Sequence, residues 1–167
     1  MYELGQDNYS LAAYQTLLFK EDDAATAYEA AIENFEQAAQ LFTGETTDEE
    51  WVELYTRWFG SYIALGDPDG ACEVFQSSVE PLGYNADVLS AFASQMQSAE
   101  QEDALIEQLT ALSEEVPEDE TDYLSSVTSY LSSAQYSLLT RLQEELSTTD
   151  EDTTTEDTTT EDTSTDE

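Results

Sequence analysis

The chain contains no histidine, a single cysteine and only three basic residues among 167. Without histidine, a Ser-His or Cys-His pair cannot activate a nucleophile, and a histidine metal site is impossible. Cys72 cannot form an intramolecular disulfide, and no base or second thiol lies near it in the sequence, so we interpret it as an inert core residue. A glycine-rich phosphate loop is missing too. The sequence therefore predicts a protein that is not an enzyme and that binds no metal or other cofactor.

Glycine and proline are also scarce, at six and three residues, which argues against an all-β chain with many tight turns. No apolar run reaches the roughly 18 residues that a transmembrane helix needs, and no basic, apolar signal begins the chain. We therefore expect no transmembrane segment in this chain. A cytoplasmic location is expected if the chain is complete, and a cell-envelope or extracellular one if an N-terminal anchor has been removed.

Acidic residues, in contrast, number 39, and the formal net charge is −36. Such a surface repels nucleic-acid phosphates and anionic lipids, so neither is an expected partner. A basic or apolar protein or peptide is compatible with it. The acidity is also explained by solubility alone, or by adaptation to high salt, and both alternatives stay open.

The body of the chain has enough apolar residues for a core, with 40% hydrophobic residues, ten Tyr, six Phe and two Trp. These residues recur at spacings of three and four, which is typical of amphipathic helices. Thr47 or Asp48 precedes one of these stretches as a potential N-cap. The sequence predicts an all-α domain of about seven helices, the last of them bent at Ser132 and Ser133: residues 8–20, 23–42, 48–65, 70–79, 85–98, 102–116 and 121–146.

The composition changes at Ser147, after which no apolar residue occurs. The segment repeats Glu-Asp-Thr-Thr-Thr from Glu151 and Glu156, and a chain that cannot bury apolar surface cannot offset the entropy of ordering. We predict a domain at 1–146 and a disordered, low-complexity tail rich in Thr, Asp and Glu at 147–167. The tail is interpreted as a solubilising spacer, with phosphorylation or O-glycosylation of its threonines as alternatives.

An internal repeat accompanies the helices. The second helix of each predicted pair carries a small residue, an aromatic four later and a small residue three after that. Small residues at this spacing let two antiparallel helices approach closely, and the aromatic fills the groove toward the next pair. The motif occurs as Ala31-Phe35-Ala38 and Ala71-Phe75-Ser78, and as Ala104-Gln108-Ala111 without its aromatic.

These residues resemble the tetratricopeptide repeat (TPR) family, with about three repeats of which the third is degenerate. The second repeat matches best, with the family's first-helix positions on Tyr55, Trp58-Phe59 and Tyr62, its turn glycine on Gly66, and its second-helix residues on Ala71 and Phe75. The resemblance implies a right-handed helical-repeat solenoid of antiparallel helix pairs. It also implies a concave groove, lined by the first helices, that binds an extended peptide or a partner helix.

The resemblance further implies which residues face that groove. Arg57 is a candidate contact for a peptide carboxylate, although pairing with Glu50 or Glu53 is the alternative. Leu89 and Met96 are candidates for an apolar patch, with core packing as the alternative. The groove candidates are Glu53, Thr56, Arg57, Gly60, Ile63 and Ala64 from the second repeat, and Leu89, Ala93, Met96 and Gln97 from the third.

The leading functional hypothesis is a protein–protein interaction scaffold. The alternative is a structural or assembly protein whose repeats stack end to end into larger arrays, as solenoids with an uncapped end can. The last predicted helix carries serines at 125, 126, 129, 132 and 133 on one side, which is typical of a capping helix and favours the scaffold.

The charge generates a first prediction. Acids in the folded domain repel one another, and about 1 M salt shortens the screening length to roughly 3 Å. We expect the melting temperature to rise along a sodium chloride series, with divalent cations acting at lower concentrations than monovalent ones. A flat or falling series would mean that the acids are already neutralised by partners or bound ions.

Overall fold

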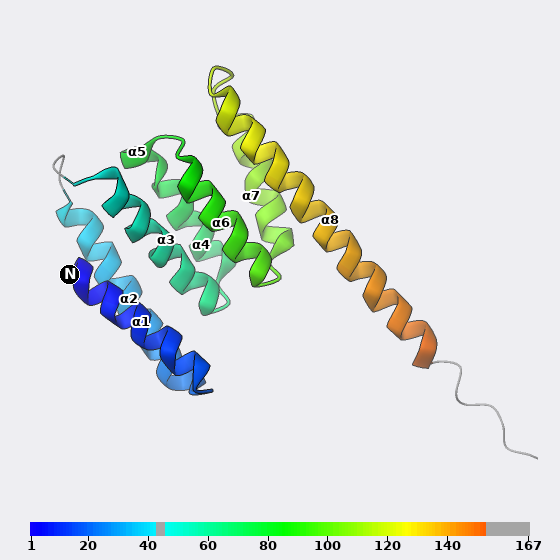
Figure 1. Ribbon diagram of the computed structural model, residues 1–167, viewed down its shortest axis with the longest axis horizontal. Coiled ribbons are helices and arrows are strands. Elements are labelled where there is room, and N and C mark those ends of the chain that lie inside the picture. Colours follow the sequence, from blue (N-terminus) through cyan, green and yellow to red (C-terminus); the bar gives the residue numbers. More distant parts are fainter. Residues whose placement is uncertain (43–45, 153–167) are drawn as a thin grey trace, which may run out of the picture.

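The computed structural model describes residues 1–42 and 46–152, and its elements there are helices without any strand (Figure 1). The predicted all-α class is confirmed. One helix, α5, is a single turn, so the other seven correspond to the helices expected. The helices are α1 (Tyr2–Leu17), α2 (Glu21–Leu41), α3 (Asp48–Ala64), α4 (Pro68–Ser77), α5 (Val79–Leu82), α6 (Ala86–Ser98), α7 (Glu102–Glu115) and α8 (Thr121–Asp152).

The turns within the pairs α1/α2, α3/α4 and α6/α7 share one geometry. Each is three residues long, and its last N–H donates to a carbonyl five residues earlier at 2.9–3.0 Å. The middle residue of each turn has a left-handed φ, which favours glycine because glycine lacks a Cβ. Only one of the three turns has a glycine. The middle residues are Gly66 (φ 74°), Phe19 (57°) and Glu100 (58°).

Contacts between helices follow their order along the chain. Helix α3 lies against α1 and α6, α6 lies against α8, and the second helices α2 and α4 pack on the first helix of the following pair. Figure 1 shows the pairs as a row with α1 and α2 at one end and α8 at the other. This arrangement is compatible with a helical-repeat fold, while the right-handed solenoid itself stays a prediction.

The centre of the core is a contact between three phenylalanines from three helices. Phe92 of α6 stacks on Phe75 of α4 at 4.3 Å and meets Phe59 of α3 edge-on at 5.4 Å, between ring centroids. The repeat motif supplies part of this core, because its residues are buried in the first two pairs. These are Ala31, Phe35, Ala38, Ala71, Phe75 and Ser78.

A second row of aromatic rings joins α1 and the end of α2 to α3. Tyr2 meets Phe42, Phe42 meets Trp51 at 4.8 Å, and Trp51 and Trp58 each stack on Tyr55. Helix α3 begins at a capping box, in which Thr47 accepts from the backbone N–H of Glu50 and the Glu50 carboxylate accepts from Thr47. The start predicted for this helix is confirmed.

The bounds predicted for the first two helices are wrong. Helix α1 begins at Tyr2, not Asn8, and runs through Gly5, where an added Cβ would lie 2.7 Å from the ring of Phe35. Glycine is therefore tolerated there because it lets α2 approach. The helix ends at Leu17 because Phe19 turns the chain, and α2 starts at once at Glu21.

The fourth predicted helix, 70–79, divides into two. Asp67 caps α4 by accepting a hydrogen bond from the Gly70 N–H at 3.0 Å, so α4 begins at Pro68. Proline fits this first helical position because the N–H that it lacks would have no partner within the helix. Pro81 lies inside the short α5, and Gly83, with a positive φ, ends it.

Helix α8 is longer than predicted and continues without a break through Ser132 and Ser133. The Ser132 hydroxyl donates to the Thr128 carbonyl, so it adds a bond to the helix backbone instead of opening it. The described helix extends to Asp152, beyond the boundary predicted at 146/147, because extending an existing helix is much easier than starting one. Of the predicted disordered tail, 147–152 belong to α8, and 153–167 lie outside the described residues.

The core generates a second prediction. Phe75 is 1% exposed and Phe19 is 91% exposed, so the same truncation tests burial at two sites. We expect Phe75→Ala to lower the free energy of unfolding by roughly 3–5 kcal/mol and Phe19→Ala to change it by less than about 0.5 kcal/mol. Chemical denaturation of both variants measures this. Equal losses would contradict the position of the core.

Candidate functional site

Four helices contain long stretches without an acidic residue. These stretches, here called the acid-poor row, are 8–17 of α1, 54–64 of α3, 88–98 of α6 and 123–143 of α8. The acids of these four helices lie outside the stretches, whereas the six acids of α2 are spread along its length, at residues 21, 22, 23, 29, 33 and 36. Negative charge is therefore absent from the acid-poor row, although it is present elsewhere on the same helices.

On α3, the predicted groove residues Glu53 and Arg57 bind each other. Their ion pair measures 2.7 Å, the Tyr2 hydroxyl donates to Glu53 at 2.7 Å, and the Arg57 guanidinium lies 5.8 Å from the centre of the Tyr9 ring. Burial and the bond to the Glu53 carboxylate raise the pKa of Tyr2, so it remains a neutral donor. Arg57 therefore stabilises the contact of α1 with α3 and is already partnered by a carboxylate.

Gly60 and Thr56 are covered by a side chain from α6. The Gln95 amide donates to the Thr56 carbonyl at 3.4 Å, and a Cβ at Gly60 would lie 2.5 Å from the Gln95 carbonyl oxygen and 3.3 Å from the Tyr9 hydroxyl. Glycine at this position therefore lets α1, α3 and α6 meet. The groove over the middle of α3 is filled by the protein's own side chains.

Leu89 and Met96 do not form an apolar patch for a partner, and the other interpretation of the two residues, core packing, is confirmed. Both are fully buried, as is Ala93, because α6 packs against α3, α4, α7 and α8. Ile63 is buried as well. Ala64 is exposed, and Gln97 donates its amide N–H to the Ser133 hydroxyl of α8 at 3.1 Å.

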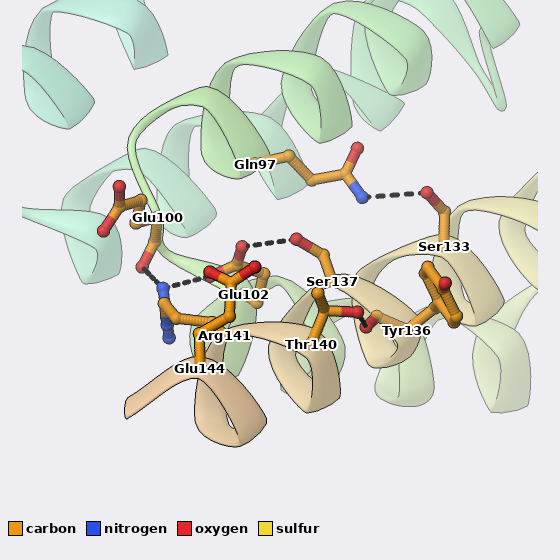
Figure 2. A pocket seen from close by; sticks show the side chains of 9 residues that line it. All are labelled: Gln97, Glu100, Glu102, Ser133, Tyr136, Ser137, Thr140, Arg141 and Glu144. Carbon is orange, nitrogen blue, oxygen red and sulfur yellow. Dashed lines mark hydrogen bonds and ion pairs between the residues drawn. The ribbon is translucent and has the colours of Figure 1, made fainter. Parts of the chain in front are cut away.

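Gln97 belongs to the wall of a hollow of about 540 Å³ between the α6–α7 turn and α8. Figure 2 shows this site, called the α8 hollow below, with side chains from both elements directed toward one another. Its walls carry hydroxyls, an amide, carboxylates and one aromatic ring. The lining residues are Gln97, Glu100, Glu102, Ser133, Tyr136, Ser137, Thr140, Arg141 and Glu144.

A buried ion pair forms one side of the α8 hollow. Arg141 donates to Glu102 at 2.6 Å and to the Glu100 carbonyl at 2.9 Å, and the Ser137 hydroxyl donates to the second Glu102 oxygen at 2.9 Å (Figure 2). The Glu102 side chain is only 4% exposed. These bonds fix α8 to the α6–α7 turn and determine the shape of the hollow.

The remaining charge in the α8 hollow is negative. Arg141 is the one base that lines the hollow, and it is paired with Glu102. Glu100 and Glu144 are exposed acids on the rim of the hollow. The Tyr136 ring is 74% exposed beside them. Carboxylates next to an open aromatic face suit a lysine or arginine side chain, which both groups attract.

Sequence reasoning missed most of the α8 hollow. Its residues come from the end of α6, the following turn and the start of α7 on one side, and from α8 on the other. The hydrogen bonds between the two sides join residues 35 to 41 positions apart, and nothing in the local sequence indicates that they meet. One signal was present. Arg141 is the only base after Arg57, so an acid partner for it was to be expected.

Other reactive groups give no sign of a reaction site. Burial raises the pKa of the half-buried Cys72 thiol to about 11, which fits its interpretation as inert. Within the part of the chain that the structure describes, no three His, Cys, Asp or Glu side chains form a group that could hold a metal ion. Among those same residues, no helix combines the length and apolarity needed to span a bilayer.

Comparison of the chain with family models, with curated proteins and with solved structures finds no match. The resemblance to the TPR family therefore stays a prediction that rests on the residues of the repeats.

The ion pair generates a third prediction. Removing the base with Arg141→Met leaves the Glu102 carboxylate buried beside only the Ser137 hydroxyl, which should destabilise the fold by roughly 3 kcal/mol. The double variant Glu102→Gln/Arg141→Met buries no charge and should recover a large part of that loss. Urea denaturation of both variants measures the difference. A double variant less stable than Arg141→Met would contradict the role assigned to this pair.

Proposed function

We propose that the protein is a protein–protein interaction scaffold that binds a basic, extended peptide between α6 and α8. A lysine or arginine side chain of the peptide enters the α8 hollow. The observation that carries this proposal is the combination of Glu100, Glu144 and the open Tyr136 ring at a concave site whose own base is already paired.

The polar lining of the α8 hollow supports a peptide rather than a small apolar ligand. Hydroxyls of Ser133 and Thr140 and the amide of Gln97 are groups that donate to or accept from peptide backbone. The hydrogen bond between Tyr130 and Ser90, at 2.9 Å, continues this uncharged polar surface between α6 and α8. An extended chain lying there would find backbone partners over more than one residue.

The net charge supports a basic partner. A protein with a charge of −36 attracts cationic peptides over distances comparable to the screening length and raises their association rate at low salt. Because 88–98 of α6 and 123–143 of α8 contain no acids, the peptide reaches them with little loss of hydration from carboxylates. The acids around the row direct the approach, and the α8 hollow selects the cationic side chain.

The fourth prediction tests this proposal with a library of capped octapeptides in which one position is varied at a time and binding is measured. We expect enrichment of Lys or Arg at one position and binding that weakens with salt. For the best peptide, Glu100→Gln/Glu144→Gln should raise Kd by roughly tenfold, because two contacts to the cationic side chain are lost.

Glu114→Gln/Glu115→Gln on α7 is the matched control, since it removes the same charge from exposed positions that do not line the α8 hollow. It should change Kd by less than about twofold. Equal effects from the two double variants would show that only net charge attracts the peptide, and no preference for a basic residue would remove the proposal.

A further inference from the structure

The outward side of α1 is an apolar stripe. Its exposed residues recur at spacings that place them on one side of the helix, while Gly5 and Ala12 on the other side are buried in the protein. Leu17, the last residue of α1, and Phe19, in the turn that follows, extend the exposed apolar surface. The residues of this stripe, called the α1 face, are Leu4, Leu11, Tyr14 and Leu18.

The two ends of the row of helices differ in this respect. Helices α1 and α8 are the end helices (Figure 1), and the exposed residues on the first half of α8 include Ser125, Thr128, Ser129 and Ser132. A helical-repeat protein needs a polar outer surface on its terminal helices to remain soluble. The first half of α8 meets that need. The leucines exposed on its second half, at 139, 142 and 146, adjoin Glu144 and Glu145, whereas the leucines exposed over 8–20 have no acid in that segment.

The charge around the α1 face determines what can cover it. Residues 8–20 contain no acid, and the only acids of α1 are Glu3 and Asp7. Two copies of a chain with net charge −36 repel each other over most of their surfaces, so they can approach only where acids are few. A basic partner would gain little on this face, and a second copy meets less repulsion here than at the acidic helices.

We infer that the α1 face binds the α1 face of a second copy, with the two helices antiparallel about a twofold axis. Leu11 lies at the centre of the stripe, and Leu4 and Leu18 each lie seven residues from it. Twofold symmetry about Leu11 therefore brings Leu4 opposite Leu18 of the partner subunit. The same symmetry brings Asp7, the one acid in the stripe, opposite Gln15 of the partner subunit, so the two Asp7 carboxylates do not face each other.

Symmetry also favours a closed dimer over an array. One self-complementary patch generates a dimer and no further growth, whereas a filament needs two different patches that match. The hydroxyl-rich first half of α8, and the second half with Glu144 and Glu145 among its leucines, are a poor match for the leucines of α1. The inference goes beyond the proposed peptide binding, because the α1 face and the α8 hollow lie on different helices and each can fail alone.

The dimer should be weak and should strengthen with salt. A helix of 16 residues is about 24 Å long, so a single pair of such helices buries an area at the low end of specific interfaces. Salt screens the repulsion between the two acidic bodies but leaves the apolar contact intact. Both effects predict association that increases with protein and salt concentration.

The fifth prediction concerns this dimer and is tested by sedimentation equilibrium of the full chain in about 0.1 M and about 1 M NaCl. We expect a monomer–dimer equilibrium with the tighter association in high salt. Leu11→Glu places two carboxylates together at the axis and should weaken association by at least about 100-fold. Leu142→Glu is the matched control, since Leu142 is 44% exposed on α8 and Leu11 is 48% exposed on α1, and it should leave association within about twofold.

A second variant tests the register without depending on the first. Leu11→Cys in a Cys72→Ala background should form a disulfide-linked dimer under mild oxidation, because the two sulfurs meet at the axis, and Leu142→Cys in the same background should not. A wild-type chain that stays monomeric at about 1 mM in high salt would overturn the inference. Species larger than a dimer, or equal loss of association with Leu142→Glu, would overturn it in favour of contact between α1 and α8.

Discussion

Each of the three basic side chains lies in an ion pair: Lys20 with Asp23, Arg57 with Glu53, and Arg141 with Glu102. The chain has three basic side chains for 39 acids, so water must solvate most of the acids. Burial is thus restricted to helix faces that lack acids. This constraint puts acids along α2 and keeps them out of the acid-poor row. Glu102, the only buried acid among the described residues, is the one that Arg141 neutralises.

The fold followed from sequence where packing depends on spacing. Apolar residues at three- and four-residue intervals predicted the long helices, and Phe35 and Phe75 predicted where second helices meet the core. The predicted helix bounds were wrong where a residue adopts a backbone conformation that is unusual for its type. Gly66 was predicted from its residue type, but Phe19 and Glu100 occupy the equivalent position with side chains that give no such signal. Those turns are held by backbone hydrogen bonds, which sequence patterns do not report.

The site was harder to predict than the fold. The resemblance to the TPR family placed the groove candidates on the first helices by their position in the repeat alone. It could not indicate which of these positions a neighbouring helix covers. Met96 is buried because α6 is packed on several sides, and Arg57 is engaged by an acid one turn before it. The α8 hollow depends on the meeting of the α6–α7 turn with α8, which is a tertiary contact. The unequal distribution of acids, visible in the sequence, would have been the better guide.

The scarcity of bases also limits where proteases that cut after lysine or arginine can act on the folded chain. Arg57 and Arg141 lie inside helices, whereas Lys20 is exposed in the turn between α1 and α2. Limited trypsin digestion of the described part of the chain would thus nick it at one peptide bond. After the cleavage, α1 would be held by its contacts with α2 and α3 alone, and Gly5 of α1 covers the Phe35 ring. One cleavage at Lys20 would thus leave the cover of this part of the core attached by noncovalent contacts only.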